Sequence, residues 1–406
     1  MKYGLIGKTL SHSYSKIIHD FFGNHEYELL ELPPDSVEDF LNAAGFRGIN
    51  VTIPYKETVM PFCVLDENAK KIGSVNTIVN KNGTLYGYNT DYFGFSYMAF
   101  LAGISFHGKK VVILGSGGTA KTALSVVRDC EAREIVVVSR NGENNYGNIE
   151  RHADCDVLVN TTPVGMFPNN GDSPLSLDSF TKLSAVIDVV YNPMRTKLLV
   201  EAKKAGIRTA NGLFMLTAQA LMAHNLFFGI EADKRQDLMS IEEALSKAVK
   251  RFSNIVLIGM PGCGKTTIGR ELAKIYEKDF VDTDDLIEVR TGRKIPDIIN
   301  EDGEPRFREL ESGVIAEAAA KTNQVLATGG GSVLAEENRD ALAQNGIVIF
   351  LERSLDRLAT NGRPLSVDLG VLYQQRLPIY ESFCQYEVTL DDDLADNIRR
   401  IKEALE

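Results

Sequence analysis

Short apolar runs recur through the first hundred residues, and polar or helix-forming stretches separate them. The runs lie at 2–7, 27–32, 48–54 and 76–80. A short run rich in β-branched residues and bounded by turn residues predicts a strand. We therefore expect residues 1–105 to form an α/β lobe of their own.

A second series of apolar runs follows at 111–127, 134–140, 156–163 and 185–193, and the first of them opens onto a glycine-rich turn and a helix-forming stretch. Runs of this length that alternate with helices favour a doubly wound parallel sheet, which we expect over 106–211.

One long apolar stretch, 213–230, is interrupted by polar residues and falls short of the roughly 20 residues that a membrane-spanning helix needs. It predicts a buried helix, and we expect about 212–230 to complete the first lobe.

Charged sequence begins after Gly229, with apolar residues at roughly helical spacing. Ser240 and Glu243 fit a capping box. The pattern predicts an amphipathic connecting helix over 231–252, and a new apolar run then opens a third region, 253–406. The recurring apolar residues are Leu238, Ile241, Leu245, Val249 and Phe252.

Composition narrows the class of protein. A chain of 406 residues is too long for one core and predicts two or three domains. With 44% hydrophobic residues and 13 prolines, it is expected to be globular throughout. The formal net charge of −11 disfavours nucleic acid and anionic membranes as partners, so we expect small-molecule substrates.

The cysteines and histidines narrow the chemistry. Five widely spaced cysteines without a C-x-x-C pair favour reduced thiols in a cytoplasmic protein over a disulfide framework or a zinc site. The first residues lack the apolar core of a signal peptide. All six histidines lie at or before His224, so histidine is not expected to serve chemistry in the last region.

The first glycine-rich turn fits a dinucleotide fingerprint. Gly115, Gly117 and Ala120 match G-x-G-x-x-G/A between a predicted strand and helix, and Gly118 belongs to the same turn. Where an NAD enzyme offers an acidic residue to the ribose, this chain has Arg140, which suits a 2′-phosphate and favours NADP. The alternative is that Arg140 is only a solvated strand-end residue.

Polar residues of the first lobe are further candidates. Ser13 and Ser15 lie two apart, so in an extended segment both hydroxyls would face one side and could bind a carboxylate. Lys56 follows a strand and a proline, and Asn76 and Asp91 lie near predicted turns. Each residue alone is more simply explained as a cap, a turn residue or a solvated charge.

Together these segments resemble the shikimate dehydrogenase family over essentially all of residues 1–230. The resemblance implies a substrate lobe and a Rossmann lobe for NADP, which together reduce 3-dehydroshikimate with NADPH. It assigns Lys56 and Asp91 as the catalytic pair. The matching segments are SHSYSKIIHD, NVTIPYKE, GSVNTI, GYNTDYFGF, GSGGTA, NTTPVGM, DVVYNP and NGLFMLTAQA.

The same resemblance places the substrate and the cofactor. Ser13 and Ser15 would bind the substrate carboxylate, with the ring and its hydroxyls near Thr52, Asn76, Asp91, Tyr191 and Gln219. A lysine ammonium beside a ketone can stabilise the developing charge and deliver a proton. The loop after Arg140 lacks the second basic residue that the family often carries, so the preference for NADP is expected to be weaker than usual.

The second glycine-rich turn, GMPGCGKT at 259–266, matches G-x-x-x-x-G-K-S/T in full directly after an apolar run. Backbone N–H groups of such a P-loop cradle phosphates, the lysine reaches the β/γ-phosphates and the Ser/Thr hydroxyl meets Mg²⁺. The predicted nucleotide-binding residues are Gly262, Gly264, Lys265, Thr266 and Thr267.

Acidic and basic residues follow the P-loop. Asp282 and Asp284 lie two apart after a short strand, so both carboxylates are expected on one side near the phosphates; the alternative is a solvated acidic turn. Arg308, Arg363 and Arg376 adjoin glycine or proline loops, where a lid or substrate pocket would be built.

These residues resemble shikimate kinase across roughly 254–406, on DTDDLIE, GEPRFRELE, the triple glycine and RPL in that order. The resemblance implies a P-loop α/β domain of the nucleoside-monophosphate-kinase kind with a parallel sheet, using MgATP. It implies that Asp284 lies next to the attacking hydroxyl, with Asp282 and Thr266 at the metal. Shikimate would also contact Arg308, Gly330 and Arg376, with Glu311 orienting Arg308; Arg363 would come from the lid and Arg357 from beside the adenine.

The two resemblances predict a bifunctional enzyme of aromatic amino-acid biosynthesis, because the product of one half is the substrate of the other. Two alternatives stay open. The first half could be an NAD-linked quinate/shikimate dehydrogenase, or one half could be a non-catalytic scaffold or ligand-sensing module. The pairs Lys56 with Asp91 and Lys265 with Asp284 weigh against the second alternative.

Overall fold

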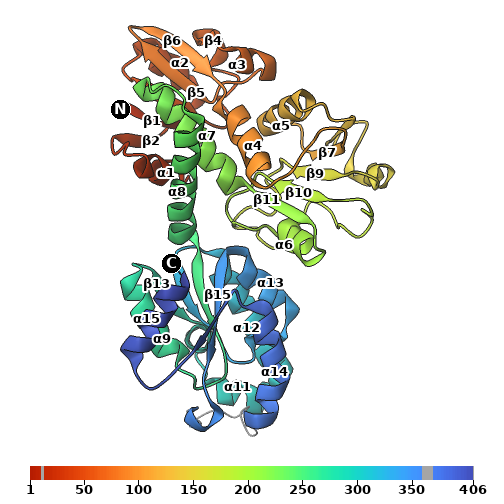
Figure 1. Cartoon of the computed structure of the whole chain (residues 1–406), viewed down its shortest axis with the longest axis vertical. Helices are drawn as coiled ribbons and strands as arrows, with labels where there is room; N and C mark the ends of the chain where they lie inside the picture. The colour runs from red at the N-terminus through yellow and green to blue at the C-terminus, as the bar shows by residue number, and fades with distance from the viewer. Residues whose placement is uncertain (11–12, 359–368, 406) are drawn as a thin grey trace. The chain divides into compact units, whose positions relative to one another are not determined.

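The computed structural model of the chain describes residues 1–10, 13–358 and 369–405. These residues form two compact units, the first made mainly of residues 1–250 and the second mainly of 251–406. In Figure 1 the first unit runs from red to green and the second continues from green to blue.

The first sheet of the first unit is mixed, in the order β2-β1-β3-β5-β6-β4. β1 pairs in parallel with β2 and β3, and the β5–β6 hairpin continues the sheet in antiparallel fashion. One hydrophobic core of this sheet contains the buried side chains of Ile6, Ile49 and Ile78. Its elements are β1 (Tyr3–Gly7), α1 (Ser15–Phe21), β2 (Tyr27–Glu31), α2 (Val37–Ala43), β3 (Gly48–Val51), β4 (Val64–Leu65), α3 (Glu67–Ile72), β5 (Thr77–Lys81) and β6 (Thr84–Tyr88).

The second sheet of this unit is wholly parallel, in the order β11-β10-β9-β7-β8. Alternate residues of β7 serve two cores: Val111 and Ile113 pack on one face, Val112 and Leu114 on the other. A strand buried on both faces is expected to be apolar throughout, as this one is. The elements are β7 (Lys110–Leu114), α5 (Gly118–Asp129), β8 (Glu134–Val138), β9 (Val157–Asn160), β10 (Ala185–Asp188), α6 (Lys197–Lys204) and β11 (Arg208–Asn211).

Two long helices, α4 (Thr90–Leu101) and α7 (Gly212–Phe228), lie side by side in the first unit (Figure 1). A side chain at Gly94 of α4 would place Cβ 2.6 Å from the carbonyl oxygen of Met215, so the close approach needs glycine there. α7 also contacts β3 and β5 of the first sheet and β11 of the second. The apolar stretch at 213–230 thus forms a helix that packs against both sheets.

The predicted connecting helix exists as α8 (Lys234–Phe252), but the predicted capping box is wrong. Asp233 caps the helix, because its Oδ1 accepts hydrogen bonds from the N–H groups of Arg235 and Gln236 at 2.9 and 3.2 Å. Ser240 therefore lies inside the helix. Most of α8 packs within the first unit: Ile241 clusters with residues of α7, and Asp237 accepts a 3.0 Å hydrogen bond from Nδ2 of Asn225.

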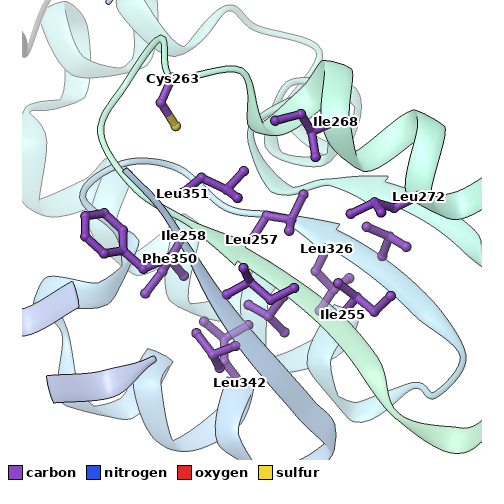
Figure 2. Packing of buried hydrophobic residues seen from close by; sticks show 14 of the residues in the cluster. Ile255, Leu257, Ile258, Cys263, Ile268, Leu272, Leu326, Leu342, Phe350 and Leu351 are labelled. Carbon is purple, nitrogen blue, oxygen red and sulfur yellow. The ribbon is translucent and has the colours of Figure 1, made fainter. Parts of the chain in front are cut away.

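The second unit is built on a five-stranded parallel sheet in the order β13-β14-β12-β15-β16. Ile268 and Leu272 of α9 join Leu257 and Leu326 of the sheet in its core (Figure 2). The elements are β12 (Asn254–Ile258), α9 (Lys265–Ile275), β13 (Asp279–Asp282), α10 (Thr283–Thr291), α11 (Ile295–Asp302), α12 (Glu304–Ala320), β14 (Gln324–Ala327), α13 (Glu336–Asn345), β15 (Gly346–Glu352), α14 (Leu369–Phe383), β16 (Tyr386–Thr389) and α15 (Leu394–Leu405).

The described residues include no helix long and apolar enough to cross a bilayer. All five cysteines lie in the described ranges and none of them forms a disulfide.

Candidate active sites

Lys56 and Asp91 form a close ion pair in the first unit. Lys56 lies in the turn after β3, and its carbonyl oxygen accepts a 2.8 Å hydrogen bond from Val75 N–H. Asp91 lies in the first turn of α4, which Asn89 caps. Nζ of Lys56 is 2.6 Å from Oδ2 of Asp91, and the two side chains are only 19% and 11% exposed. The pair is therefore partly shielded from water but still open to a small molecule.

Asn76 holds the other oxygen of Asp91. Its Nδ2 donates to Asp91 Oδ1 at 2.9 Å and to Thr90 Oγ1 at 3.0 Å, and its Oδ1 accepts from Thr90 N–H at 2.7 Å. The hydroxyl of Thr90 also donates to Oε1 of Gln219 at 3.4 Å. The structure thus gathers Lys56, Asn76, Asp91 and Gln219, which come from distant parts of the sequence. Thr90 was not predicted, although its place just before Asp91 at a helix start was a usable signal.

The two serines near the N-terminus do not lie in the extended segment that we predicted. Ser15 begins α1, and its N–H donates to the hydroxyl oxygen of Ser13 at 3.3 Å, so a turn joins them. The prediction failed because a serine hydroxyl readily bonds a backbone N–H two residues on. Between them, Tyr14 packs its ring 5.2 Å from that of Tyr191. Burial, with Tyr14 nearby, raises the pKa of Tyr191 to about 12, so its hydroxyl stays protonated.

Thr52 lies directly after β3, and its N–H donates to Ile6 O at 3.0 Å. It therefore stands where the carboxyl ends of β1 and β3 meet, two strands of the same parallel pair. Ligands of α/β sheets gather at such ends.

The glycine-rich turn after β7 leaves open space beside its backbone. Gly115 has φ of 108°, and a Cβ there would lie 2.7 Å from Oγ1 of Thr161, so the position needs glycine. At Gly117 and Gly118 a Cβ would meet nothing within 4 Å. Gly117 leaves the N-terminus of α5 without a side-chain cap, so backbone N–H groups face that space. Ala120 is buried and packs α5 onto the sheet.

Arg140 stands at the same edge of this sheet. The N–H of Gly115 donates to Val138 O at 2.8 Å, which places the end of β8 beside the glycine turn, and Arg140 follows two residues later. Its side chain is exposed. A guanidinium there is available to an anionic group bound at the turn.

The second unit contains a pocket of about 500 Å³ at the carboxyl ends of β12, β13 and β14. It is lined by ten of the residues predicted for the nucleotide and the second substrate. These are Gly262, Gly264, Lys265, Thr266, Thr267, Asp282, Asp284, Arg308, Gly330 and Arg376.

The P-loop side of the pocket holds a lysine and a hydroxyl–carboxylate pair. Nζ of Lys265 donates to the carbonyl oxygens of Gly259 and Met260, each at 2.9 Å. The hydroxyl of Thr266 donates to Oδ2 of Asp282 at 2.6 Å. Asp282 caps α10 by accepting from Asp284 N–H at 3.1 Å, so the two acids share one helix start at the pocket.

The opposite wall is built by the three glycines after β14. A Cβ at Gly330 would lie 2.6 Å from Cδ of Pro261, and one at Gly331 would lie 2.8 Å from the guanidinium of Arg308. Only residues without side chains allow the P-loop and the arginine to approach this closely. Tyr380 of α14 fixes the segment by donating its hydroxyl to Gly330 O. Tyr380 was not predicted, since a buried tyrosine has no distinctive sequence signal.

Glu311 is 1% exposed and forms an ion pair with Arg308. Its Oε2 accepts from Arg308 at 2.7 Å and its Oε1 accepts from the hydroxyl of Ser332 at 2.7 Å. Burial disfavours the charged guanidinium, but Glu311 and Glu304 outweigh it and raise the pKa of Arg308. Arg376 is also buried, at 5% exposure, so the pocket presents two fixed positive charges to an anionic ligand.

Two predicted arginines stand apart from this set. Arg357 is exposed and pairs with Asp392 at 3.4 Å, an acid that Arg353 also contacts; it is not among the residues that line the pocket. Arg363 lies outside the described residues.

Comparisons with known proteins match the two ends of the chain to two different families. Residues 261–406 match the family model for shikimate kinase, and residues 5–78 match that for the shikimate dehydrogenase substrate binding domain. The NADP(+) shikimate dehydrogenase of Clostridium perfringens is 40% identical over 263 residues, which span 59% of this chain and 97% of that protein.

Solved structures resemble the first part as well. A chorismate mutase/shikimate 5-dehydrogenase fusion protein from Clostridium acetobutylicum is 34% identical with a TM-score of 0.57, over 61% of this chain and 96% of that one. Shikimate 5-dehydrogenase from Thermus thermophilus, solved with NADP(H) and shikimate, is 28% identical with a TM-score of 0.54, over 60% and 99% of the two chains.

Proposed function

Because the chain belongs to the shikimate dehydrogenase family and carries a shikimate kinase domain at its C-terminal end, we propose that it catalyses two consecutive reactions. In the first, 3-dehydroshikimate is reduced to shikimate with NADPH. In the second, the 3-hydroxyl of shikimate is phosphorylated with MgATP. The observation that carries the proposal is the presence, in one chain, of the Lys56–Asp91 pair and of the P-loop pocket that Arg308 and Arg376 line.

Reduction requires a hydride, a proton and a place for the substrate carboxylate. NADPH supplies the hydride when bound at the glycine turn, where the uncapped start of α5 and the exposed Arg140 fit a dinucleotide with a 2′-phosphate. Lys56 donates the proton to the carbonyl oxygen as charge develops there. Asp91 holds the lysine in place, and Asn76 keeps Asp91 oriented in turn. Ser13 and Ser15 bind the carboxylate, with Thr52, Tyr191 and Gln219 around the ring.

Phosphoryl transfer requires positioning and charge neutralisation more than covalent chemistry. Lys265 exchanges its two carbonyl partners for the phosphates of ATP, and the N–H groups around Gly262 and Gly264 cradle them. Asp284 accepts the proton of the attacking hydroxyl. Arg308 and Arg376 hold the shikimate carboxylate, and Glu311 fixes Arg308. Arg363 and Arg357 are proposed to act at the transferring phosphoryl group and the adenine.

The donor set at Thr266 and Asp282 fits Mg²⁺. A hydroxyl and a carboxylate 2.6 Å apart beside the P-loop offer the hard oxygen ligands that Mg²⁺ prefers. Within the described residues, no three His, Cys, Asp or Glu side chains cluster as a complete metal cage. This agrees with a metal held by one or two protein groups plus phosphates and water.

Separate assays of each reaction test the proposal. The purified chain is expected to oxidise NADPH when given 3-dehydroshikimate and to consume ATP when given shikimate. The ratio of kcat/KM for NADPH and NADH tests the role of Arg140: Arg140→Ala should lower that ratio while leaving ATP consumption unchanged. An unmodified chain that prefers NADH, or that oxidises quinate in preference to shikimate in the reverse direction, would contradict this assignment.

A further inference from the structure

Two loops leave the carboxyl edge of the second sheet beside the glycine turn, one after β9 and one after β10. Thr161 of the first loop donates its N–H and its hydroxyl to Leu114 O, at 2.9 and 2.6 Å. The second loop carries Tyr191, which contacts Tyr14 between the two serines. The geometry of the proposed reduction therefore depends on how these two loops are held relative to each other.

The carboxyl group of Asp188 joins the two loops. Its Oδ1 accepts from Nδ2 of Asn160 at 3.1 Å and from Val190 N–H at 3.0 Å, and its Oδ2 accepts from the Thr196 hydroxyl at 2.7 Å. Asp188 and Asn160 are completely buried, and Thr196 is 1% exposed. Both ends of the loop 188–196 are thus fastened to one side chain.

Asn160 extends the link to the loop after β9, and Val190 extends it to α7. Oδ1 of Asn160 accepts from the N–H and the hydroxyl of Thr162, at 3.0 and 2.7 Å. The carbonyl oxygen of Val190 accepts a 3.0 Å hydrogen bond from Gly212 N–H, at the first residue of α7. One network therefore spans both loops and the start of the helix that carries Gln219.

We propose that Asp188 is a positioning residue for the reduction, and that it holds Tyr191 and the start of α7 in register with the glycine turn through neutral hydrogen-bond donors. This inference rests on the proposed reductase function. The hydrogen-bond partners of Asp188 in the described part of the chain are an amide, a hydroxyl and a backbone N–H. Burial raises its pKa to about 6, which the three donors only partly offset. The carboxyl therefore acts through the geometry of bonds to uncharged groups, and none of these partners is a cation.

Three variants test the inference. Asp188→Ala removes the link and should lower kcat/KM for 3-dehydroshikimate by about 10- to 100-fold, with a higher KM for NADPH, because small misplacements of reacting groups have effects of that size. Thr196→Val removes one bond and should lower kcat/KM by about fivefold. Asp188→Asn keeps both acceptor bonds on its amide oxygen and can donate to Thr196, so it should remain close to the unmodified chain.

Asp156 provides a matched control at the opposite edge of the same sheet, where its Oδ2 accepts a 2.8 Å hydrogen bond from Lys110 N–H. Asp156→Ala should lower the melting temperature of the first unit and leave the KM for NADPH unchanged. The inference is overturned if folded Asp188→Ala keeps its kcat and both KM values, or if Asp188→Asn is as impaired as Asp188→Ala. If Asp188→Ala is insoluble, unchanged kinetics in Thr196→Val overturn it.

Failure of the proposed function would be seen separately, as an unmodified chain that reduces no 3-dehydroshikimate. In that event a fluorescence titration with NADPH still decides the inference. Weaker binding by Asp188→Ala with restored binding by Asp188→Asn supports it, and equal Kd values for all three proteins overturn it.

Discussion

Lys56 and Asp91 are 35 positions apart in the chain, yet their charged groups lie 2.6 Å apart in the first unit. Asp91→Asn would keep the shape of the acid and remove its charge. We expect reduction to fall by about 10²- to 10⁴-fold, the usual contribution of a positioned proton donor, because the ammonium of Lys56 loses its orienting partner. Initial rates of NADPH oxidation measure this.

The matched control for that prediction is an exposed ion pair of the same unit. Glu26 pairs with Lys2 at 2.5 Å, and their side chains are 61% and 42% exposed. Exposed pairs contribute little to stability, so Glu26→Gln should leave reduction unchanged. Equal losses in the two variants would show that removal of any ion pair disturbs the unit, and that Asp91 has no special role.

Gly330→Ala should abolish phosphorylation of shikimate and spare reduction. Its Cβ would lie 2.6 Å from Cδ of Pro261 and 2.9 Å from that residue's backbone nitrogen, so the P-loop must shift. Gly313→Ala is the control, because a Cβ at this exposed position of α12 meets nothing within 4 Å. It should stabilise the helix by about 0.5–1 kcal/mol and keep full kinase activity. Kinase activity in Gly330→Ala close to that of Gly313→Ala would argue against the tight glycine wall.

His19 should make the first unit sensitive to acid. Burial, then the neighbouring His224, lowers the pKa of His19 from 6.5 to about 3, although the nearby Asn50 opposes the shift. The folded unit therefore binds this proton less readily than the unfolded chain does. The contribution of neutral His19 to stability is fully present above pH 6.5 and is lost as the pH falls from there toward 3.

His19→Phe tests this by removing the titrating group. Protonation of His19 should change the unfolding free energy of the unmodified chain by about 1.4 kcal/mol per pH unit. The variant should lack this part of the pH dependence. Urea unfolding of the first unit at several pH values between 4 and 7 measures the slopes. Identical slopes in the two proteins would rule out His19 as the source.

The boundary between the units predicts which fragments fold. A fragment of residues 1–250 retains most of α8, whose Ile241 packs with Ala218 and Leu221 of α7, and it should reduce 3-dehydroshikimate. A fragment of residues 1–233 lacks α8 and should unfold at lower temperature, because it exposes that apolar face. Equal melting temperatures would show that α8 is only a tether.

The sequence predicted β7 and β12, and also the edge strands β2 and β8, but it did not predict the edge strands β4 and β11. β7 and β12 are continuous apolar runs, and such runs are hard to mistake. β11, with the sequence RTAN, is a polar edge strand, and β4 has only two residues, so neither carries enough apolar sequence to be noticed.

Site residues were predictable where a residue type is unusual at its position, as Lys265 is in the P-loop. Asp188 was not, because an aspartate at a strand end is commonly a turn residue, and only the fold brings Asn160 and Thr196 to it. The start of α8 was misplaced for a related reason: Asp233 and Ser240 are both good caps, and the sequence does not say which one the backbone uses.

The most direct test of the two-reaction account is one coupled assay of the full chain with 3-dehydroshikimate, NADPH and MgATP, with shikimate and shikimate 3-phosphate quantified by mass. The unmodified chain should form shikimate 3-phosphate. Lys56→Ala should form neither product but still phosphorylate added shikimate, and Lys265→Ala should accumulate shikimate. Loss of both activities from either folded variant, or an unmodified chain that stops at shikimate, would contradict the account.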